Sequence, residues 1–300
     1  MRFGLVGTGY WARVTHAVAL AREPVVDFTG VWGRDPGRAA ELAEELGVQS
    51  YLEYESMLED VEAVDFSVPP NVQAELAVRA AKAGKHLLLE KPIATSPEVA
   101  RHLEAAVEEE GVATVVFFTT SFVEAQREWL ADLARTNGWR GGWVQWITSA
   151  LAPGSPYSAS AWRQEKGALW DLGPHALFIL SAALGSVVDV AADAGAGDLV
   201  HLVLHHQGGA TSTVSMTLEG PPEAGHFEIT LWGDSGLSTM PLGSTSPEEA
   251  LCVALQELVE CATTGERAHP CDVHFGRHVV ELLARAEDSI AGRPAAHESA

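Results

Sequence analysis

Apolar and polar positions in the first 120 residues follow two alternating periods. Short runs rich in Val, Leu and Phe are each followed by stretches in which apolar residues recur every three or four positions. The first pattern is typical of buried strands and the second of amphipathic helices. Strands are predicted at residues 2–6, 25–32, 61–68, 86–89 and 112–118, and helices at 10–22, 36–46, 71–83 and 96–110. This alternation predicts a doubly wound parallel sheet.

The pattern changes after about residue 120. Helices are predicted at residues 123–136, 171–184, 247–263 and 272–291, and residues 151–166 resemble a loop with three Gly or Pro residues. Strands are predicted at residues 143–149, 187–192, 199–205, 211–218, 226–232 and 237–240. Because most of these strands follow one another directly, they predict an antiparallel sheet. We therefore expect two domains, an α/β domain at residues 1–120 and an α+β domain at residues 121–300.

Composition narrows the class of protein. A chain of 300 residues with 47% hydrophobic and 20% charged residues is an ordinary globular mixture, long enough for two domains. Acidic residues number 41 and basic residues 19, which gives a net charge of −22. Because such a chain repels phosphate backbones and anionic lipids, we expect no nucleic acid and no membrane partner.

The cysteines and the N-terminus indicate a reducing compartment. The chain has three cysteines and no C-x-x-C pair, so a disulfide framework is not expected. The opening MRFGLVGTG lacks the apolar core of a signal peptide, and no apolar run reaches the ~18 residues of a membrane span. We expect a soluble, cytoplasmic protein. We also expect no metal, because ligand spacing is absent among Cys261, His269, Cys271, His274 and His278.

A glycine-rich turn follows the first predicted strand. The run Gly7-Thr8-Gly9-Tyr10-Trp11-Ala12 matches G-x-G-x-x-G/A and opens the helix at residues 10–22. Gly7 allows a tight turn, Gly9 lets a pyrophosphate approach the backbone, and Ala12 lets helix and strand pack closely. The N-terminus of the following helix adds backbone N–H groups that can bind phosphate oxygens. The turn predicts a Rossmann dinucleotide-binding domain, although S-adenosylmethionine enzymes also use glycine-rich turns.

The end of the second strand bears on which dinucleotide is bound. NAD-binding domains place an acidic residue there, on the ribose 2′-hydroxyl, but this position is Gly33 and Arg34 follows it. Asp27 lies at the wrong end of the strand, and Asp35 is the remaining acid that could turn inward. A small residue followed by an arginine leaves room and positive charge for a 2′-phosphate. We therefore expect NADP as the preferred cofactor, with NAD possible.

Two further groups of residues suggest chemistry. Glu90-Lys91-Pro92 ends the strand at residues 86–89, and ligands bind at the carboxyl ends of such strands. Lys91 is one of only four lysines, and it could donate to a substrate oxygen; the alternative is a solvated loop lysine. If Asp171 begins a helix, His175 lies one turn later on the same face and could exchange a proton. The alternative is a capping aspartate and a surface histidine.

Together these motifs resemble the glucose–fructose oxidoreductase, inositol dehydrogenase and MocA family (Gfo/Idh/MocA) over nearly the whole chain. The motifs that carry the resemblance are Gly7-x-Gly9-x-x-Ala12, Val68-Pro69-Pro70-Asn71, Glu90-Lys91-Pro92, Trp162-Arg163 and Gly167-x-x-x-Asp171-x-Gly173-x-His175. The resemblance implies a Rossmann domain and a second domain built on a large, open, mainly antiparallel sheet. That sheet often makes oligomer contacts, so a homodimer or homotetramer is expected.

The resemblance also implies hydride transfer between nicotinamide C4 and a carbinol or carbonyl carbon of a small sugar-, polyol- or cyclitol-like substrate. Lys91 would polarise the reacting oxygen, His175 would be the general acid/base, and Asp171 would position substrate or His175. Glu90 and Pro92 would shape the nicotinamide pocket. The family pattern further places Pro69 and Asn71 in the cofactor cleft, and Trp162 and Arg163 near the substrate.

The chain departs from the family pattern at Lys166-Gly167, which replaces a glycine pair, and at three places that bear on the substrate pocket. Gln73 replaces a frequent histidine, Thr119–Ser121 replace an Asn-Arg or Arg-Arg pair, and Phe178 replaces an aspartate three residues after the catalytic histidine. The missing arginines weaken the case for an anionic substrate. The departures also leave an alternative open, namely a catalytically silent dinucleotide sensor or interaction protein on the same fold.

Overall fold

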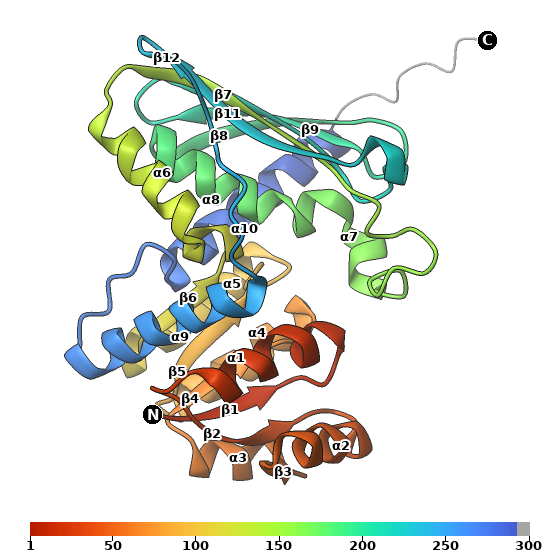
Figure 1. Ribbon diagram of the computed structural model, residues 1–300, viewed down its shortest axis with the longest axis vertical. Helices are drawn as coiled ribbons and strands as arrows, with labels where there is room; N and C mark the ends of the chain where they lie inside the picture. The colour runs from red at the N-terminus through yellow and green to blue at the C-terminus, as the bar shows by residue number, and fades with distance from the viewer. Residues whose placement is uncertain (293–300) are drawn as a thin grey trace. The chain divides into compact units, whose positions relative to one another are not determined.

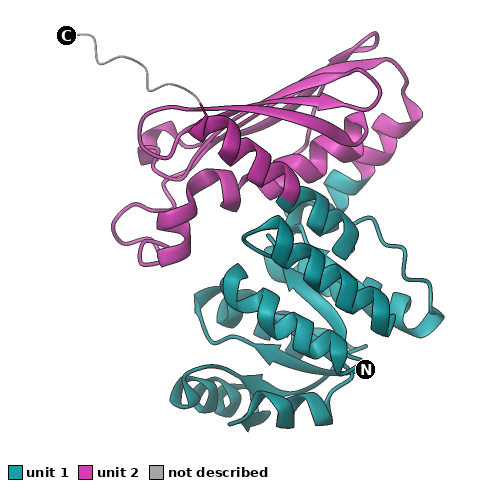
Figure 2. Ribbon diagram, turned by 180° about the vertical axis from the view of Figure 1, so that it is seen from behind, with its two compact units in different colours: residues 1–127, 242–280 teal, residues 128–241, 281–300 magenta. Residues whose placement is uncertain are grey.

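The computed structural model describes residues 1–292, which divide into two compact units (Figure 2). The first unit contains residues 1–127 and 242–280, and the second contains residues 128–241 and the part of helix α10 from Glu281 onward. This division differs from the predicted organisation, which has a single domain boundary after residue 120. The chain returns to the first unit because α9 (Pro247–Thr264) buries its apolar stripe against α1 (Ala17–Arg22), β5 (His86–Glu90) and β6 (Thr114–Phe117) of that unit.

The first unit is built on a six-stranded parallel sheet with the strand order β3-β2-β1-β4-β5-β6. Its strands are β1 (Arg2–Val6), β2 (Asp27–Trp32), β3 (Gln49–Tyr51), β4 (Ala63–Phe66), β5 (His86–Glu90) and β6 (Thr114–Phe117). The doubly wound parallel sheet is therefore confirmed. The strand order reverses between β1 and β4, and ligands of such folds bind outside the carboxyl ends of the strands at this point.

Helices connect these strands (Figure 1). They are η1, a π-helical turn (Ala12–His16), α1 (Ala17–Arg22), α2 (Pro36–Leu46), α3 (Tyr54–Asp60), α4 (Pro70–Lys82) and α5 (Pro97–Glu110). Ser96 caps α5 by accepting from the Val99 N–H, as its position before Pro97 predicts. No strand or helix was predicted for β3 and α3, because both elements are short and carry polar residues. The short 3-10 turn η2 (Thr119–Phe122) follows β6.

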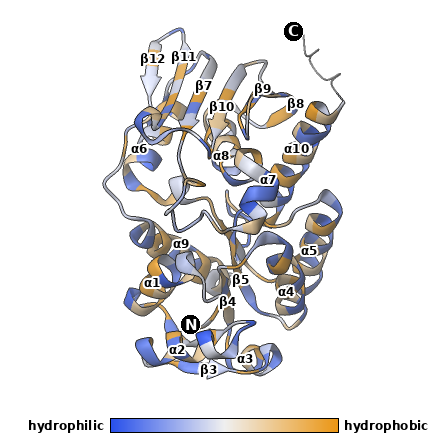
Figure 3. Ribbon diagram, turned by 90° about the vertical axis from the view of Figure 1, so that its right-hand side faces the viewer, coloured by the Kyte–Doolittle hydropathy of each residue, from blue (hydrophilic) through white to orange (hydrophobic). Residues whose placement is uncertain are grey.

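The second unit is built on a six-stranded sheet with the order β12-β11-β7-β10-β9-β8. Its strands are β7 (Trp139–Ile147), β8 (Val187–Ala194), β9 (Val200–His206), β10 (Thr211–Thr217), β11 (His226–Gly233) and β12 (Gly236–Thr239). Every neighbouring pair is antiparallel except β7 and β10, which are parallel because helices carry the chain away between them. Buried and more exposed residues alternate along β9 and β10, and the strands of this sheet carry both hydrophilic and hydrophobic residues (Figure 3).

The remaining helices are α6 (Glu124–Arg135), α7 (Ala161–Asp171), α8 (Gly173–Leu184), the short η3 (Pro222–Ala224) and α10 (Val273–Ala291). The loop expected through residue 166 ends at Ser160, where α7 begins, and α7 kinks at Gly167 (φ 61°, ψ −162°). Among the described residues, the helical run Ala161–Leu184 is long and apolar enough to span a membrane. However, 78% of its most apolar window is buried, as in a core helix.

Candidate functional site

The two glycines of the turn after β1 serve different purposes. Gly7 has φ +139°, and a Cβ there would lie 2.3 Å from the Ser67 carbonyl oxygen, so the fold itself requires glycine. A Cβ on Gly9 would meet no protein atom within 4 Å. Ala12 is fully buried, which brings the helix onto the sheet. The chain's own packing therefore explains Gly7 and Ala12, whereas Gly9 keeps the turn open on its outer side.

That open side fits the pyrophosphate of a dinucleotide. A side chain at Gly9 would fill the space in front of the turn, and Gly9 and Tyr10 are exposed at the first residues of the helix. N–H groups at a helix N-terminus have no partners within the helix and favour an anion. Thr8 and Trp11, the other two members of the motif, are half-buried beside them.

The end of β2 presents an arginine and no inward-facing acid. Asp35 Oδ1 accepts the N–H groups of Gly37 and Arg38 at 3.0 and 3.2 Å, so this side chain turns back to cap α2. Arg34 is exposed. A Cβ on Gly33 would lie 2.8 Å from the Thr8 methyl group, which gives this glycine a packing reason independent of any cofactor. Asp27 lies exposed at the opposite end of the strand.

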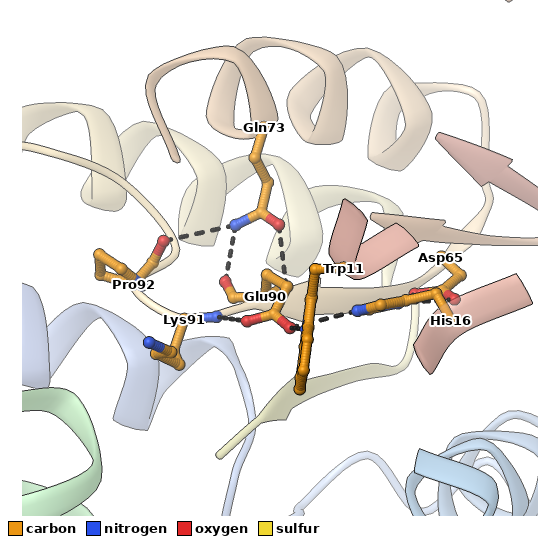
Figure 4. Close-up of polar contacts among 7 residues, drawn as sticks. All are labelled: Trp11, His16, Asp65, Gln73, Glu90, Lys91 and Pro92. Atoms are coloured by element: carbon orange, nitrogen blue, oxygen red, sulfur yellow. Dashed lines mark hydrogen bonds and ion pairs between the residues drawn. The ribbon is translucent and has the colours of Figure 1, made fainter. Parts of the chain in front are cut away.

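The loop after β5 is held by a buried glutamine (Figure 4). Gln73 Oε1 accepts the Glu90 N–H at 2.8 Å, and Gln73 Nε2 donates to the Glu90 carbonyl at 2.7 Å. The amide thus meets both backbone groups of Glu90, as the peptide group of a neighbouring strand would. Nε2 also lies 3.4 Å from the Pro92 carbonyl oxygen, and the Lys91–Pro92 peptide bond is cis. Gln73, which stands where the family pattern often has a histidine, therefore holds in place the loop that carries Lys91.

A buried polar network joins this loop to the helix after the glycine turn. His16 Nδ1 lies 2.8 and 2.9 Å from the two Asp65 oxygens, and its Nε2 lies 3.2 Å from Glu90 Oε1. Trp11 Nε1 donates to the same Glu90 oxygen at 2.6 Å. Burial alone would lower the pKa of His16, but the two carboxylates raise it to about 10, so the ring is an imidazolium. Burial raises the pKa of Asp65, against the opposing effect of His16.

Sequence reasoning did not single out His16 or Asp65. An indication was present in the chain, because Asp65 interrupts an apolar stretch that forms a strand buried on both faces. A charged side chain in such a position requires a buried partner. Which residue supplies that partner depends on the packing of the first helix, and no spacing rule links position 16 to position 65.

In the second unit, Asp171 is paired with an arginine. Arg163 Nε lies 2.9 Å from Asp171 Oδ2, and both side chains are largely buried. The Arg163 guanidinium also lies over the rings of Tyr157 and Trp162, at 4.6 and 4.7 Å from their centroids. Trp162 and Arg163, expected near the substrate, are thus brought together with Asp171. Arg163 therefore holds the Asp171 side chain in one orientation.

The helix boundary at Asp171 differs from the prediction. Asp171 ends α7 instead of starting a helix, so it is not a cap. The backbone nevertheless stays helical through Leu172 (φ −93°, ψ −34°), and the four-residue spacing to His175 keeps both on one helical face. His175 is buried, with its ring 5.7 Å from that of Trp146 on β7. Phe178, one turn further on, is a buried packing residue.

The other expected positions lie at strand ends or in packing. Pro69 precedes α4 and Asn71 is exposed in its first turn, after β4. Ser121 is buried and donates to the Phe118 carbonyl at 2.7 Å. Among the described residues, one group with metal-ligand spacing is Glu104, Glu108 and His274, and Arg277 already lies 2.7 Å from Glu104. The absence of a metal centre stays a prediction.

The sequence of the first unit matches a known family. The family described as "Oxidoreductase family, NAD-binding Rossmann fold" (GFO_IDH_MocA) matches residues 1–118. Residues 1–118 therefore match the NAD-binding domain of the Gfo/Idh/MocA oxidoreductases. The chain is 29% identical to levoglucosan dehydrogenase of Pseudarthrobacter phenanthrenivorans over 59% of its own length and 49% of that relative. It is 26% identical to D-xylose 1-dehydrogenase (NADP(+)) 2 of Haloferax volcanii over 96% of its own length and 90% of that relative.

Solved structures share the fold of the whole chain. Levoglucosan dehydrogenase in complex with NADH and levoglucosan has a TM-score of 0.85 at 20% identity, and 97% of both chains is covered. A probable dehydrogenase from Thermotoga maritima has a TM-score of 0.86 at 18% identity, again with 97% of both chains covered. At these identities the likeness establishes the Rossmann domain with a second, mainly antiparallel sheet. The alignment with the curated levoglucosan dehydrogenase spans only about half of that relative.

Proposed function

We propose that this protein is an NAD(P)-dependent dehydrogenase or reductase that interconverts a hydroxyl and a carbonyl group on a small sugar-, polyol- or cyclitol-like substrate. One observation carries the proposal: the Gly7–Ala12 turn and the Glu90–Pro92 loop are tied together through Glu90, at the carboxyl ends of β1 and β5. A phosphate-binding turn and a lysine are thereby fixed at one edge of the sheet. Relatives named for levoglucosan and D-xylose support the substrate class.

Each proposed role follows from side-chain chemistry. A bound nicotinamide supplies or accepts the hydride. Lys91 donates from its ammonium group to the reacting oxygen and polarises it. His175 takes the hydroxyl proton during oxidation and returns it during reduction, because an imidazole nitrogen can both accept and donate a proton. Asp171, held by Arg163, positions substrate or His175.

Turnover by a Lys91 variant tests the mechanism. Purified protein is screened with NADP and NAD against sugars, polyols and cyclitols, and reduction of the cofactor is followed by absorbance. Lys91→Ala is expected to lower kcat by at least ~100-fold, which is within the range of a lost proton donor. Lys82→Ala, which removes an exposed lysine at the end of α4, is the control. Full turnover by Lys91→Ala would refute the mechanism. Tight cofactor binding without turnover on any substrate would favour the silent sensor.

We propose NADP as the preferred cofactor, because Arg34 is exposed at the end of β2 while Asp35 turns away to cap α2. Thermal unfolding with NADPH or NADH tests this preference, since a ligand at 100 times its Kd stabilises by about 2.7 kcal/mol. Arg34→Ala is expected to weaken NADPH binding about tenfold and to leave NADH binding unchanged. Arg22→Ala, at the far end of α1, is the control. A larger shift with NADH in the wild type would overturn the preference.

We further propose a homodimer or homotetramer in the cytoplasm, formed through the outer face of the second unit's sheet. Large apolar side chains are exposed on this face: Val203 is 42%, Trp232 43% and Leu237 69% exposed. Light scattering during size-exclusion chromatography gives the mass in solution, and Trp232→Arg is expected to reduce it. A monomeric wild-type protein would contradict the proposal.

A further inference from the structure

His16 and Asp65 are buried beneath the glycine turn together with the largely buried Glu90, and none of the three exchanges a proton or a hydride in the proposed reaction. The side chains of His16 and Asp65 are 0% exposed and that of Glu90 is 13% exposed. Apolar residues of similar volume would usually stabilise such a position as well or better, because burying charges costs solvation. Stability alone therefore does not explain why these three side chains lie together at this position. The geometry of their hydrogen bonds provides a better explanation.

The π-helical turn η1 directs two donors at one oxygen. In an α-helix with 3.6 residues per turn, residues five apart such as Trp11 and His16 would lie about 140° apart around the axis. The wider π turn brings them towards the same side, and both reach Glu90 Oε1, at 2.6 and 3.2 Å. The other ring nitrogen of His16 donates to Asp65, so Asp65 fixes the ring orientation.

The second oxygen of Glu90 faces the lysine loop. Glu90 Oε2 accepts the backbone N–H of Lys91 at 3.1 Å, and Gln73 holds the Glu90 backbone in place. A single carboxylate therefore touches the helix of the glycine turn with one oxygen and the lysine loop with the other (Figure 4).

We propose that His16 is a positioning residue for Lys91: by holding the Glu90 carboxylate, it couples the dinucleotide-binding turn to the backbone of Lys91. The effect on turnover rests on the proposed function, whereas the coupling itself is a property of the free chain. A dinucleotide at the turn should then change the environment of the Lys91 N–H. Loss of the His16–Glu90 contact should lower kcat more than it raises the cofactor Kd.

Two amide substitutions separate the two contacts of the ring. In His16→Gln the amide nitrogen can take the place of Nε2 and still reach Glu90, whereas in His16→Asn it can take the place of Nδ1 and reach only Asp65. Both variants remove the same charge and a similar volume. Asp65→Asn is a third variant that keeps the histidine. Its amide group can donate to Nδ1, so a neutral ring keeps its proton on Nε2 and still donates to Glu90; this variant should therefore behave like His16→Gln.

Selective ¹⁵N-lysine labelling gives a readout that needs no turnover. The chain has four lysines, Lys82, Lys85, Lys91 and Lys166, so the labelled protein gives four backbone amide peaks. In His16→Asn we expect the Lys91 peak to move and to lose its response to NADPH, with the other three in place. In His16→Gln and Asp65→Asn the position of the Lys91 peak and its response to NADPH should both be close to wild type. Equal behaviour of His16→Gln and His16→Asn, or an unmoved Lys91 peak in all variants, would overturn the proposal.

Kinetics complete the test where a substrate is found. His16→Asn should lower kcat at least tenfold with a cofactor Kd within threefold of wild type, and His16→Gln should retain most of kcat. Equal loss of kcat in both would indicate a merely structural role. If no substrate is turned over, the proposed function fails, while the Lys91 peak still decides the coupling. If the His16 variants do not fold, the wild-type Lys91 peak decides the coupling: a peak that does not respond to NADPH would overturn it.

Discussion

The two glycines of the turn after β1 should respond oppositely to the same substitution. In Gly7→Ala the new methyl group would lie 2.3 Å from the Ser67 carbonyl oxygen and 2.9 Å from its carbon, at a φ of +139°. A non-glycine residue in this conformation costs about 1–3 kcal/mol, and pushing the neighbouring loop away costs about 1–3 kcal/mol more. The expected loss of stability is therefore about 4 kcal/mol, or roughly 8–16 °C in Tm for a unit of this size.

Gly9→Ala adds the same methyl group two residues later, where no atom lies within 4 Å. The free energy of unfolding should stay within about 0.5 kcal/mol of wild type. The methyl group would, however, fill the outer side of the turn. We expect the Kd for NADPH to rise at least tenfold, which corresponds to about 1.4 kcal/mol.

Thermal unfolding and fluorescence titration with NADPH measure both quantities on the same samples. Wild type, Gly7→Ala and Gly9→Ala are compared with and without NADPH. A Gly9→Ala protein that binds NADPH as tightly as wild type would refute the assignment of the open side to the pyrophosphate. A Gly7→Ala protein as stable as wild type would show that the Ser67 contact relaxes freely.

Three further predictions follow from the charges and buried contacts. Gln73→Leu leaves the N–H and C=O of Glu90 without their side-chain partner and should cost about 2–6 kcal/mol in urea unfolding, since each unsatisfied group costs about 1–3 kcal/mol; a change below about 0.5 kcal/mol would contradict it. Because the folded-state pKa of His16 is raised to about 10, its contribution to stability is fully present below about pH 6.5 and is lost as the pH rises towards 10. Urea unfolding at several pH values should therefore show a steeper decline for wild type than for His16→Gln, and parallel declines would count against the raised pKa. With a net charge of −22, the protein should gain thermal stability between about 20 and 500 mM NaCl as self-repulsion is screened, and an unchanged Tm would argue against that repulsion.

Much of the fold could be predicted from local pattern. The helix Pro36–Leu46 was predicted to the residue, because Pro at its first position and Gly47 at its end are strong local boundary markers. The return of α9 to the first unit and the parallel pairing of β7 with β10 could not be predicted. Both features depend on which elements pack together after a long intervening stretch of chain. An amphipathic pattern predicts that one face of a helix or strand is buried, but it does not predict which element covers that face.

The candidate site likewise contains features that the sequence predicts and contacts that only the structure reveals. The sequence by itself determined the glycine turn, the lysine at a strand end and the Asp171–His175 spacing, because each is a short motif whose chemistry depends on neighbours within one turn or one loop. Only the tertiary structure decided that Gln73 completes the backbone of Glu90 and that His16 lies between Asp65 and Glu90. These hydrogen bonds join residues that are 17 to 74 positions apart in the sequence. Close packing of a helix against the sheet brings the residues together, so a local periodicity in the sequence cannot predict the contacts.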